Sequence, residues 1–331
     1  MRALERSRMH RALLSAPAWV LPGASADLDF VHGRAWAGGA ASPSSLIACT
    51  RASAGMAQKA NGGWATFAAN APRITDQGLL AEESRTNLFL NSAAPVTQTI
   101  TLSATGSYTL SVWGVSGSAT VAAGTATGTG FGAVGAAVTG GRLTFSITAT
   151  GTITVTISGS PLYVQVEAGA FGTSPIITGG SSVTRAADVV TLIDVALTAA
   201  RNAKAFRGMT NSIPAFINNN MIFAFGSGPV CCVNFQAVNK TGTYNGTSSA
   251  QATIGNSGTI SGLVKTAAGF DTTSVTNLSN NGLKATYTGA WPNVSAQTAY
   301  LGNEGGVGQL NGYLLRATFG TNKGQFDNET A

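Results

Sequence analysis

Charge is scarce in this sequence. Lys, Arg, Asp and Glu make up 10% of its 331 residues, against about a quarter in ordinary globular proteins. Disorder requires low hydrophobicity together with high net charge, whereas 44% of this chain is hydrophobic, so we expect a packed core. Between residues 86 and 166 the one charged side chain is Arg142, and between 208 and 264 it is Lys240. Such segments suit a rigid β protein, copied many times or buried against partners, better than a lone enzyme.

Cysteine and long apolar runs are also in short supply. The three cysteines, Cys49, Cys231 and Cys232, form neither a disulfide framework nor a zinc-binding pattern. We therefore interpret them as packing residues of a protein that folds in a reducing cytoplasm. No segment offers the roughly 18 uninterrupted apolar residues of a membrane span, so we expect no membrane insertion.

The net charge of +6 invites a nucleic-acid hypothesis, but its distribution argues against it. The first eleven residues contain four arginines and Glu5, a net of 4 − 1 = +3, which is half of the total. No basic stripe interleaved with aromatic residues follows, so we expect no nucleic-acid partner. The apolar run after the arginines is broken by Pro17 and Pro22, unlike a secretion signal. We expect a short basic arm that anchors the protein through Arg2, Arg6, Arg8 and Arg11.

What the sequence does contain is short stretches of period-two alternation, separated by turns rich in Gly, Ser and Asn. From residue 97 these include TQTITLSA, SYTLSVWGV, RLTFSITA and GTITVTISG, and from residue 221 MIFAFGSG, TAYLGN and NGYLLRATFG. This pattern is typical of β-sandwiches and jelly rolls. One short helix is expected near Leu197–Ala203. The sequence predicts an all-β fold: an N-terminal arm and extended connector (1–90), then two tandem antiparallel, jelly-roll-like β-sandwich modules (91–186 and 187–331).

Two motifs carry a resemblance to a known group of proteins. QVEAGAFGTSPIITGGSSVTRAAD (165–188) and GLLAEESRTNLFLNS (78–92) resemble segments of phage tail-fibre, tailspike and head-fibre (head spike) proteins, which also occur in phage-derived gene transfer agents. The resemblance implies a jelly-roll module followed by a concanavalin- or laminin-G-like module. It also implies a protein made in the bacterial cytoplasm and located on the surface of the virion. Tail and capsid attachment both remain open.

The resemblance further implies partners and a role. The arm would bind other virion proteins, and the subunit would form a homo-oligomer, either a trimer or a pentamer. The expected function is adhesion to bacterial surface polysaccharide. Weak single sites, with millimolar Kd worth about −4 kcal/mol, would gain avidity from repetition.

The longer motif reads as a joint between the two sandwiches. Pro175 cannot donate a backbone hydrogen bond, and Gly179 and Gly180 allow turns with positive φ. Charged residues three positions apart can hold such a linker by an ion pair or by hydrogen bonds to the backbone. We therefore interpret Glu167, Arg185, Asp188 and Arg85 as structural hinge residues.

Catalysis is not expected. Glycoside hydrolysis requires two carboxylates about 5 to 10 Å apart, and most of the thirteen acids lie beside arginines or at the joints. His10 and His32 both lie in the N-terminal segment, so a Ser-His-acid triad has no evident place. We predict no enzyme and no cofactor; a capsule depolymerase stays as the third alternative.

Glycan binding on a β-sandwich needs an exposed aromatic face with amide or carboxylate partners. The candidate glycan-binding residues are Trp291, Tyr287, Tyr300, Asn303, Glu304 and Trp113. Core or subunit-interface packing is the competing interpretation for each aromatic residue. Asp271, Asn303 and Glu304 also carry the oxygen ligands that Ca²⁺ prefers, although solvated turns explain them equally well. The second hypothesis for the whole chain is a structural decoration or connector protein of the virion, without a ligand.

Overall fold

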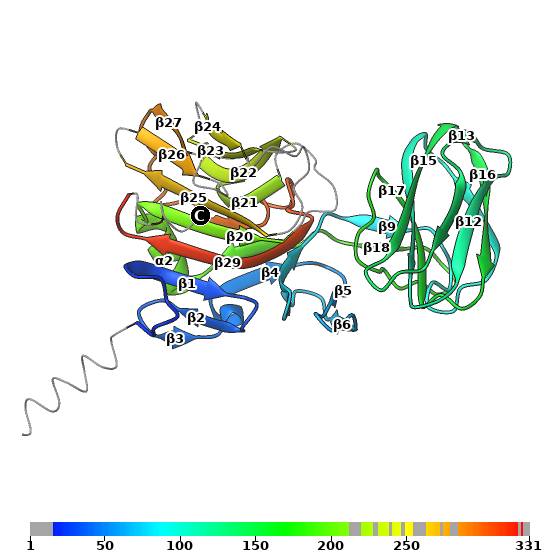
Figure 1. Ribbon diagram of the computed structural model, residues 1–331, viewed down its shortest axis with the longest axis horizontal. Helices are drawn as coiled ribbons and strands as arrows, with labels where there is room; N and C mark the ends of the chain where they lie inside the picture. Colours follow the sequence, from blue (N-terminus) through cyan, green and yellow to red (C-terminus); the bar gives the residue numbers. More distant parts are fainter. Residues whose placement is uncertain are drawn as a thin grey trace, which may run out of the picture. The chain divides into compact units, whose positions relative to one another are not determined.

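The computed structural model describes residues 16–211, 220–227, 231–237, 240–245, 249–253, 263–271, 274–278, 284–323 and 326. It confirms the all-β prediction, since antiparallel strands dominate the described residues and one α-helix lies among them. The chain divides into two compact units (Figure 1). Unit 1 is made of the described parts of 1–50, 74–82 and 188–331, and unit 2 of 51–73 and 83–187. The described helix is too short to cross a membrane.

Unit 1 consists of two antiparallel sheets, whose strand numbers refer to the described residues. The ten-stranded sheet has the order β27-β26-β25-β20-β29-β1-β2-β3, with β8 paired to β29 and to β7. Its strands are β1 (Ala24–Asp29), β2 (Arg34–Trp36), β3 (Ala40–Ala41), β7 (Arg73–Thr75), β8 (Gly78–Ala81), β20 (Ala205–Thr210), β25 (Val264–Phe270), β26 (Ser274–Leu278), β27 (Lys284–Thr288) and β29 (Gly312–Gly320).

The second sheet of unit 1 has the order β24-β23-β22-β21-β28-β19-β4. Its strands are β4 (Ile47–Thr50), β19 (Val189–Leu192), β21 (Asn220–Phe225), β22 (Cys231–Ala237), β23 (Lys240–Tyr244), β24 (Ser249–Thr253) and β28 (Ala299–Leu301). The 3-10 turn η1 (Pro43–Ser45) precedes β4, and the helix α2 (Asp194–Asn202) follows β19.

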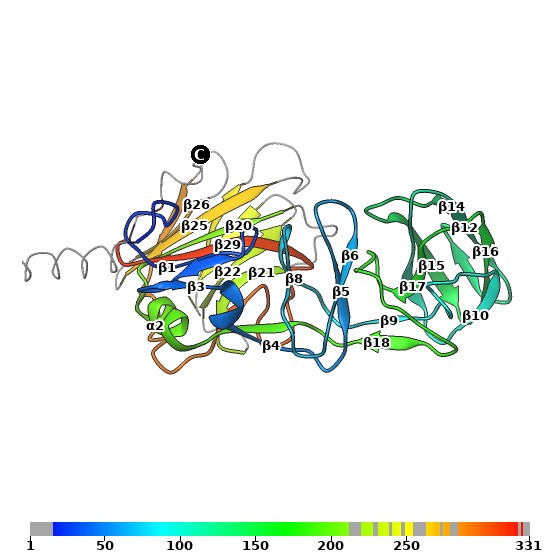
Figure 2. The same ribbon diagram turned by 90° about the horizontal axis from the view of Figure 1, so that it is seen from below.

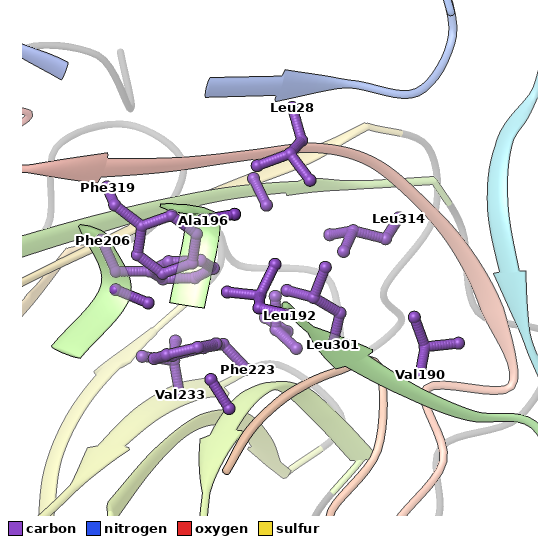
Figure 3. Packing of buried hydrophobic residues seen from close by; sticks show 14 of the residues in the cluster. Leu28, Val190, Leu192, Ala196, Phe206, Phe223, Val233, Leu301, Leu314 and Phe319 are labelled. Carbon is purple, nitrogen blue, oxygen red and sulfur yellow. The ribbon is translucent and has the colours of Figure 1, made fainter. Parts of the chain in front are cut away.

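The core of unit 1 lies between these sheets, and its largest side chains are phenylalanines, among them Phe206, Phe223 and Phe319 (Figure 3). The ring of Phe223 stacks on Phe206 at a centroid distance of 4.9 Å and meets Phe319 edge-on at 5.1 Å. Helix α2 contributes Ala196 to the same cluster. All three cysteines are free and buried, as expected of packing residues, and burial raises the thiol pKa of Cys231 and Cys232.

Residues 24–50 differ from the expected connector because they are strands of unit 1. Strand β1 pairs with β29, and Leu28 lies opposite Ala317. The Arg316 guanidinium of β29 binds the Asp27 carboxylate of β1 at 2.7 Å, although 289 positions separate the two residues. The physical reason is that Ala26, Leu28 and Phe30 are apolar and fully buried, so this segment needs a sheet to cover it. Arg2, Arg6, Arg8 and Arg11 lie outside the described residues.

Unit 2 is a sandwich of two four-stranded sheets (Figure 2). One has the order β10-β16-β12-β14 and the other β13-β15-β11-β17. The strands are β10 (Gln98–Leu102), β11 (Gly106–Trp113), β12 (Ser118–Ala123), β13 (Thr127–Thr129), β14 (Gly132–Gly135), β15 (Gly141–Ala149), β16 (Gly151–Ser158) and β17 (Tyr163–Ala168). Two further two-stranded sheets accompany them: the hairpin of β5 (Gly55–Gln58) with β6 (Trp64–Phe67), and the long-range pair of β9 (Arg85–Asn87) with β18 (Val183–Arg185).

Candidate functional site

The residues expected to form a hinge are built into buried polar networks. The Glu167 carboxylate accepts hydrogen bonds from the backbone N–H of Thr173 at 2.7 Å and from the Gln165 amide at 2.8 Å. Burial raises the pKa of this carboxyl group, and these hydrogen bonds and the charge of Arg185 oppose the rise. The Arg185 guanidinium is buried and donates to the Ser174 hydroxyl at 3.0 Å. These residues hold the segment after β17 against the sandwich of unit 2.

The other two hinge candidates lie next to the points where the chain leaves one unit for the other. Asp188 is buried in unit 1, where its backbone and side chain exchange hydrogen bonds with the backbone of Glu82 at 3.0 and 2.9 Å. Arg85 belongs to unit 2, where its guanidinium pairs with Glu83 and lies 4.6 Å from the Phe171 ring centroid. Both residues therefore have partners within their own units. Their expected role as hinge residues stays a prediction.

Two of the expected glycan-binding residues are inaccessible. Trp113 is fully buried. Its side chain faces away from the core of the sandwich, but the Trp64 ring covers it there, edge-on at a centroid distance of 6.1 Å. Asn303 is also fully buried, and its amide binds the carbonyls of Val190 and Leu301. We correct both assignments: these side chains stabilise the fold and cannot reach a glycan.

The remaining glycan candidates do not make up one described aromatic site. Trp291 is half-buried and stacks on Phe270 at 4.0 Å, against the core of unit 1. Tyr300 and Glu304 are partly exposed neighbours, and burial raises the pKa of the Glu304 carboxyl group. Tyr287 belongs to β27, but its side chain lies outside the described part.

The oxygens considered for Ca²⁺ have other partners. The Asp271 carboxylate accepts hydrogen bonds from the Lys323 ammonium and the Ser274 backbone, both at 2.9 Å. The Asn303 side-chain oxygen accepts from Gly305 at 3.1 Å. Among the described residues, no three His, Cys, Asp or Glu side chains gather in a group that could hold a metal ion.

Unit 2 contains a groove with room for a ligand. Its volume is about 540 Å³. It lies between the tip of the β5–β6 hairpin, the turn after β11 and the loop between β16 and β17. The lining residues are Asn61, Gly62, Gly63, Trp64, Ala93, Gly114, Val115, Val138, Ser160, Pro161 and Leu162. We call it the Trp64 groove.

Local contacts fix the hairpin tip that carries Trp64. The Gln58 amide donates to the carbonyls of Gly62 and Val138, the latter at 2.6 Å. Gly62 has a positive φ of 83°, and a Cβ added there would lie only 2.5 Å from the Val138 side chain. The tip therefore packs closely on the loop after β14, and only glycine fits at the point of contact.

The chemistry of the groove is neutral and mostly apolar. Val115, Leu162 and Val138 expose 91%, 48% and 44% of their surface, and Trp64 is half-buried between them and Trp113. Asn61 and Ser160 supply short polar groups, and none of the described lining residues is charged. Such a site suits an uncharged ligand that offers both an apolar face and hydrogen-bonding groups.

Sequence reasoning missed this groove. Trp64 falls in a segment interpreted as a connector, and its one local signal is the turn NGG directly before it. That turn predicts a hairpin with a displayed aromatic residue, but Leu162 and Val115, which complete the groove, are about 50 to 100 positions away.

Comparison with known proteins adds little. No protein-family model matches the chain, and neither does any curated protein. Among solved structures, the mouse laminin alpha1 chain, domains LG4-5, is similar over 73% of this chain and 87% of that chain, at 9% identity and a TM-score of 0.26. At that TM-score the similarity carries no argument about function.

Proposed function

We propose that unit 2 is a saccharide-binding module, and that the chain is an adhesive subunit of a virion fibre or spike that binds bacterial surface glycan. The Trp64 groove is the observation that carries this proposal. A sugar offers C–H faces to an aromatic ring and hydroxyls to amides and hydroxyls. The half-buried Trp64 ring, the neutral lining and the short groups of Asn61 and Ser160 match that chemistry.

The virion part of the proposal is supported by the two motifs. Arg85 and Asn87 of the first motif and Glu167 and Arg185 of the second all belong to unit 2 and stabilise the fold that displays the groove. In this proposal the N-terminal arginines bind other virion proteins, and several copies of the chain act together. A single neutral sugar site with millimolar Kd contributes about −4 kcal/mol, so repetition is needed for firm adhesion.

A structural subunit without a ligand is the second candidate, favoured by one observation. Trp113 is fully buried and Trp291 half-buried, as expected if the aromatic residues serve only packing. Trp64 and the exposed Val115 beside it support the saccharide-binding proposal, because an apolar groove open to water is typical of a binding site.

The test is binding of the purified full chain to a panel of neutral polysaccharides: dextran, mannan and purified bacterial capsular polysaccharides. Trp64→Ala should lower retention on the bound polysaccharide at least tenfold, since the aromatic contact is lost, while Trp64→Phe restores most of it. Trp36→Ala, which changes a half-buried tryptophan of unit 1, is the matched control.

Unchanged retention of Trp64→Ala would refute the groove as the binding site. A wild-type chain that binds no member of the panel would leave the structural subunit as the better function. Thermal unfolding of each variant separates loss of the site from loss of the fold.

A further inference from the structure

The tip of the β5–β6 hairpin offers a hydrogen-bond donor to the Trp64 groove, because its acceptors are already engaged. The Asn61 side-chain oxygen accepts from the Gly63 backbone N–H at 3.0 Å. The Gly63 carbonyl accepts from the Lys59 N–H at 2.8 Å, and the Gly62 carbonyl accepts from the Gln58 amide at 3.2 Å. The –NH2 group of Asn61 has no partner among the described residues, so it is the end left for a ligand. A ligand that binds at the tip must therefore present an acceptor oxygen.

The rest of the groove is more apolar than a sugar ring requires. Val115 is almost completely exposed, and Leu162 and Val138 are exposed in the same groove. One face of a sugar ring carries C–H groups, which the single ring of Trp64 can cover. A hydroxyl placed against the three aliphatic side chains would lose water without gaining a hydrogen bond, which is costly. The lining therefore favours a sugar that carries an apolar substituent.

Charge and size narrow the substituent further. The lining residues that the structure describes include neither an acid nor a base, so a charged amino sugar or uronic acid would find no partner there. A 6-deoxy sugar has a methyl group but no carbonyl oxygen for the Asn61 amide. An acetamido group is neutral and combines a methyl group, an acceptor carbonyl and a donor N–H. The volume of about 540 Å³ is within the range of small-molecule pockets, so a ring with such a substituent has room.

We propose that the Trp64 groove selects sugars that carry an acetamido group. The sugar ring lies against Trp64, and the methyl group packs on Val115 and Leu162. The carbonyl oxygen accepts a hydrogen bond from the Asn61 amide, and the N–H donates to the Ser160 hydroxyl. This proposal rests on the saccharide-binding function proposed above and names the class of sugar that the same groove takes.

The experiment compares sugars that differ only at this substituent. The full chain is mixed with N-acetylglucosamine or glucose, and with N-acetylgalactosamine or galactose, and saturation-transfer NMR records which ligand protons lie against the protein. Titrations give the affinity of each sugar. The 6-deoxy sugars rhamnose and fucose test a methyl group without an amide. Retention on the polysaccharide panel described above is measured with the same protein.

Two variants test the two contacts of the acetamido group. Asn61→Asp keeps the oxygen that accepts from Gly63 and removes the donor. Its matched control is Asn293→Asp, because Asn293 is an exposed residue of unit 1 that accepts from the Ser295 N–H at the same distance of 3.0 Å. Val115→Ser removes the methyl contact, and Val307→Ser, at an exposed valine of unit 1, is its control.

We expect each acetamido sugar to bind roughly tenfold more tightly than its parent hexose, since a hydrogen bond and the burial of a methyl group are added. The acetyl methyl protons should receive the strongest saturation. Asn61→Asp should weaken acetamido sugars roughly tenfold and Val115→Ser severalfold, the latter with a weaker methyl signal. Both controls should behave as wild type, and thermal unfolding should show all four variants folded.

Each contrary result has one meaning. Hexoses or 6-deoxy sugars that bind as tightly as acetamido sugars, with Trp64 still required, overturn this inference and leave the saccharide-binding groove intact. The same holds if a polysaccharide retains the chain but no acetamido sugar gives saturation transfer. No binding of any sugar or polysaccharide overturns both proposals. A changed sedimentation coefficient in Val115→Ser, with sugar binding unchanged, assigns the groove to a second copy of the chain and overturns the inference.

Discussion

The two outer faces of the unit 2 sandwich have similar sequences but differ in their exposure to solvent. The β10-β16-β12-β14 face is open to solvent and carries the exposed residues Thr99, Thr101, Thr120 and Thr156. The β13-β15-β11-β17 face also alternates Thr and Ser with apolar residues, yet Thr109 and Ser111 on it are fully buried. The segment after β17 covers it, and the Thr109 hydroxyl donates to the Gly169 carbonyl at 2.9 Å. A period-two pattern thus identifies the outward face of a strand but not whether water reaches it.

The difference between the faces comes from one strand, β17. It places Gln165 and Glu167 on the covered face, and both bind the segment that follows them, at Ile176 and Thr173. No comparable amide or acid lies on β12 or β16. The comparison teaches that a buried carboxylate with several donors can fold a polar segment over a face that its composition alone would leave exposed.

Removing that carboxylate should have the largest effect. Glu167→Ala leaves the Thr173 N–H and the Gln165 amide buried without their acceptor, which should cost roughly 3 kcal/mol of unfolding free energy. Urea unfolding measures this. Glu167→Gln keeps the shape and one acceptor oxygen and should lose clearly less. A loss below about 0.5 kcal/mol in Glu167→Ala would show that the covering segment does not depend on Glu167.

The second-largest loss of stability is expected from a substitution that pushes the segment after β17 away from the sheet. A Cβ added at Gly172 would lie 2.3 Å from the Ser111 hydroxyl and 2.8 Å from the Arg142 guanidinium. We expect Gly172→Ala to destabilise the protein by about 1 to 3 kcal/mol through overpacking. Gly179→Ala is the matched control, because nothing lies within 4 Å of a Cβ there. Equal stability of the two variants in thermal unfolding would contradict close packing on this face.

The covered face should also respond to pH. Burial raises the Glu167 pKa above the ordinary value of 4.5. A raised pKa in the folded state contributes stability that is fully present below the pKa of the unfolded chain and is lost as pH rises through the folded pKa. Relative to Glu167→Gln, wild type should therefore lose unfolding free energy as pH increases from about 4 to about 7. A difference between the two proteins that does not change with pH would refute the raised pKa.

Substitutions on the open β10-β16-β12-β14 face should hardly change the unfolding free energy. Thr99→Val and Thr101→Val alter exposed side chains without buried partners, so each should change unfolding free energy by less than about 0.5 kcal/mol. Urea unfolding beside Glu167→Ala gives the contrast directly. A loss above about 1 kcal/mol would mean that these two threonines also have an internal structural role.

Local patterns predicted the fold class well. The alternation in TLSVW and TITVT places Leu110 and Val155 in the core as expected, and α2 overlaps the expected helix. These features depend on neighbours within a few residues, which a sequence displays directly.

The site was harder to predict because it depends on distant neighbours. Trp113 lies on the outward face of β11, as its alternation with Leu110 requires, and becomes inaccessible because Trp64, 49 positions earlier, covers it. Asn303 looks like a ligand in its glycine-rich loop, but its amide binds Val190 from another strand. Only tertiary contacts distinguish a displayed tryptophan such as Trp64 from a buried one.

The interleaving of the two units also sets an order of events during translation. Unit 2 is complete once residue 187 has been made, and it has its own core. Unit 1 is not, since β1 waits for β29, nearly 290 residues later. At about 5 to 20 residues per second, this interval lasts roughly 15 to 60 s. The nascent chain can pair one edge of Ala24–Asp29 with β2 at once, but it must keep the other edge of this strand unpaired until β29 has been made, while unit 2 already folds.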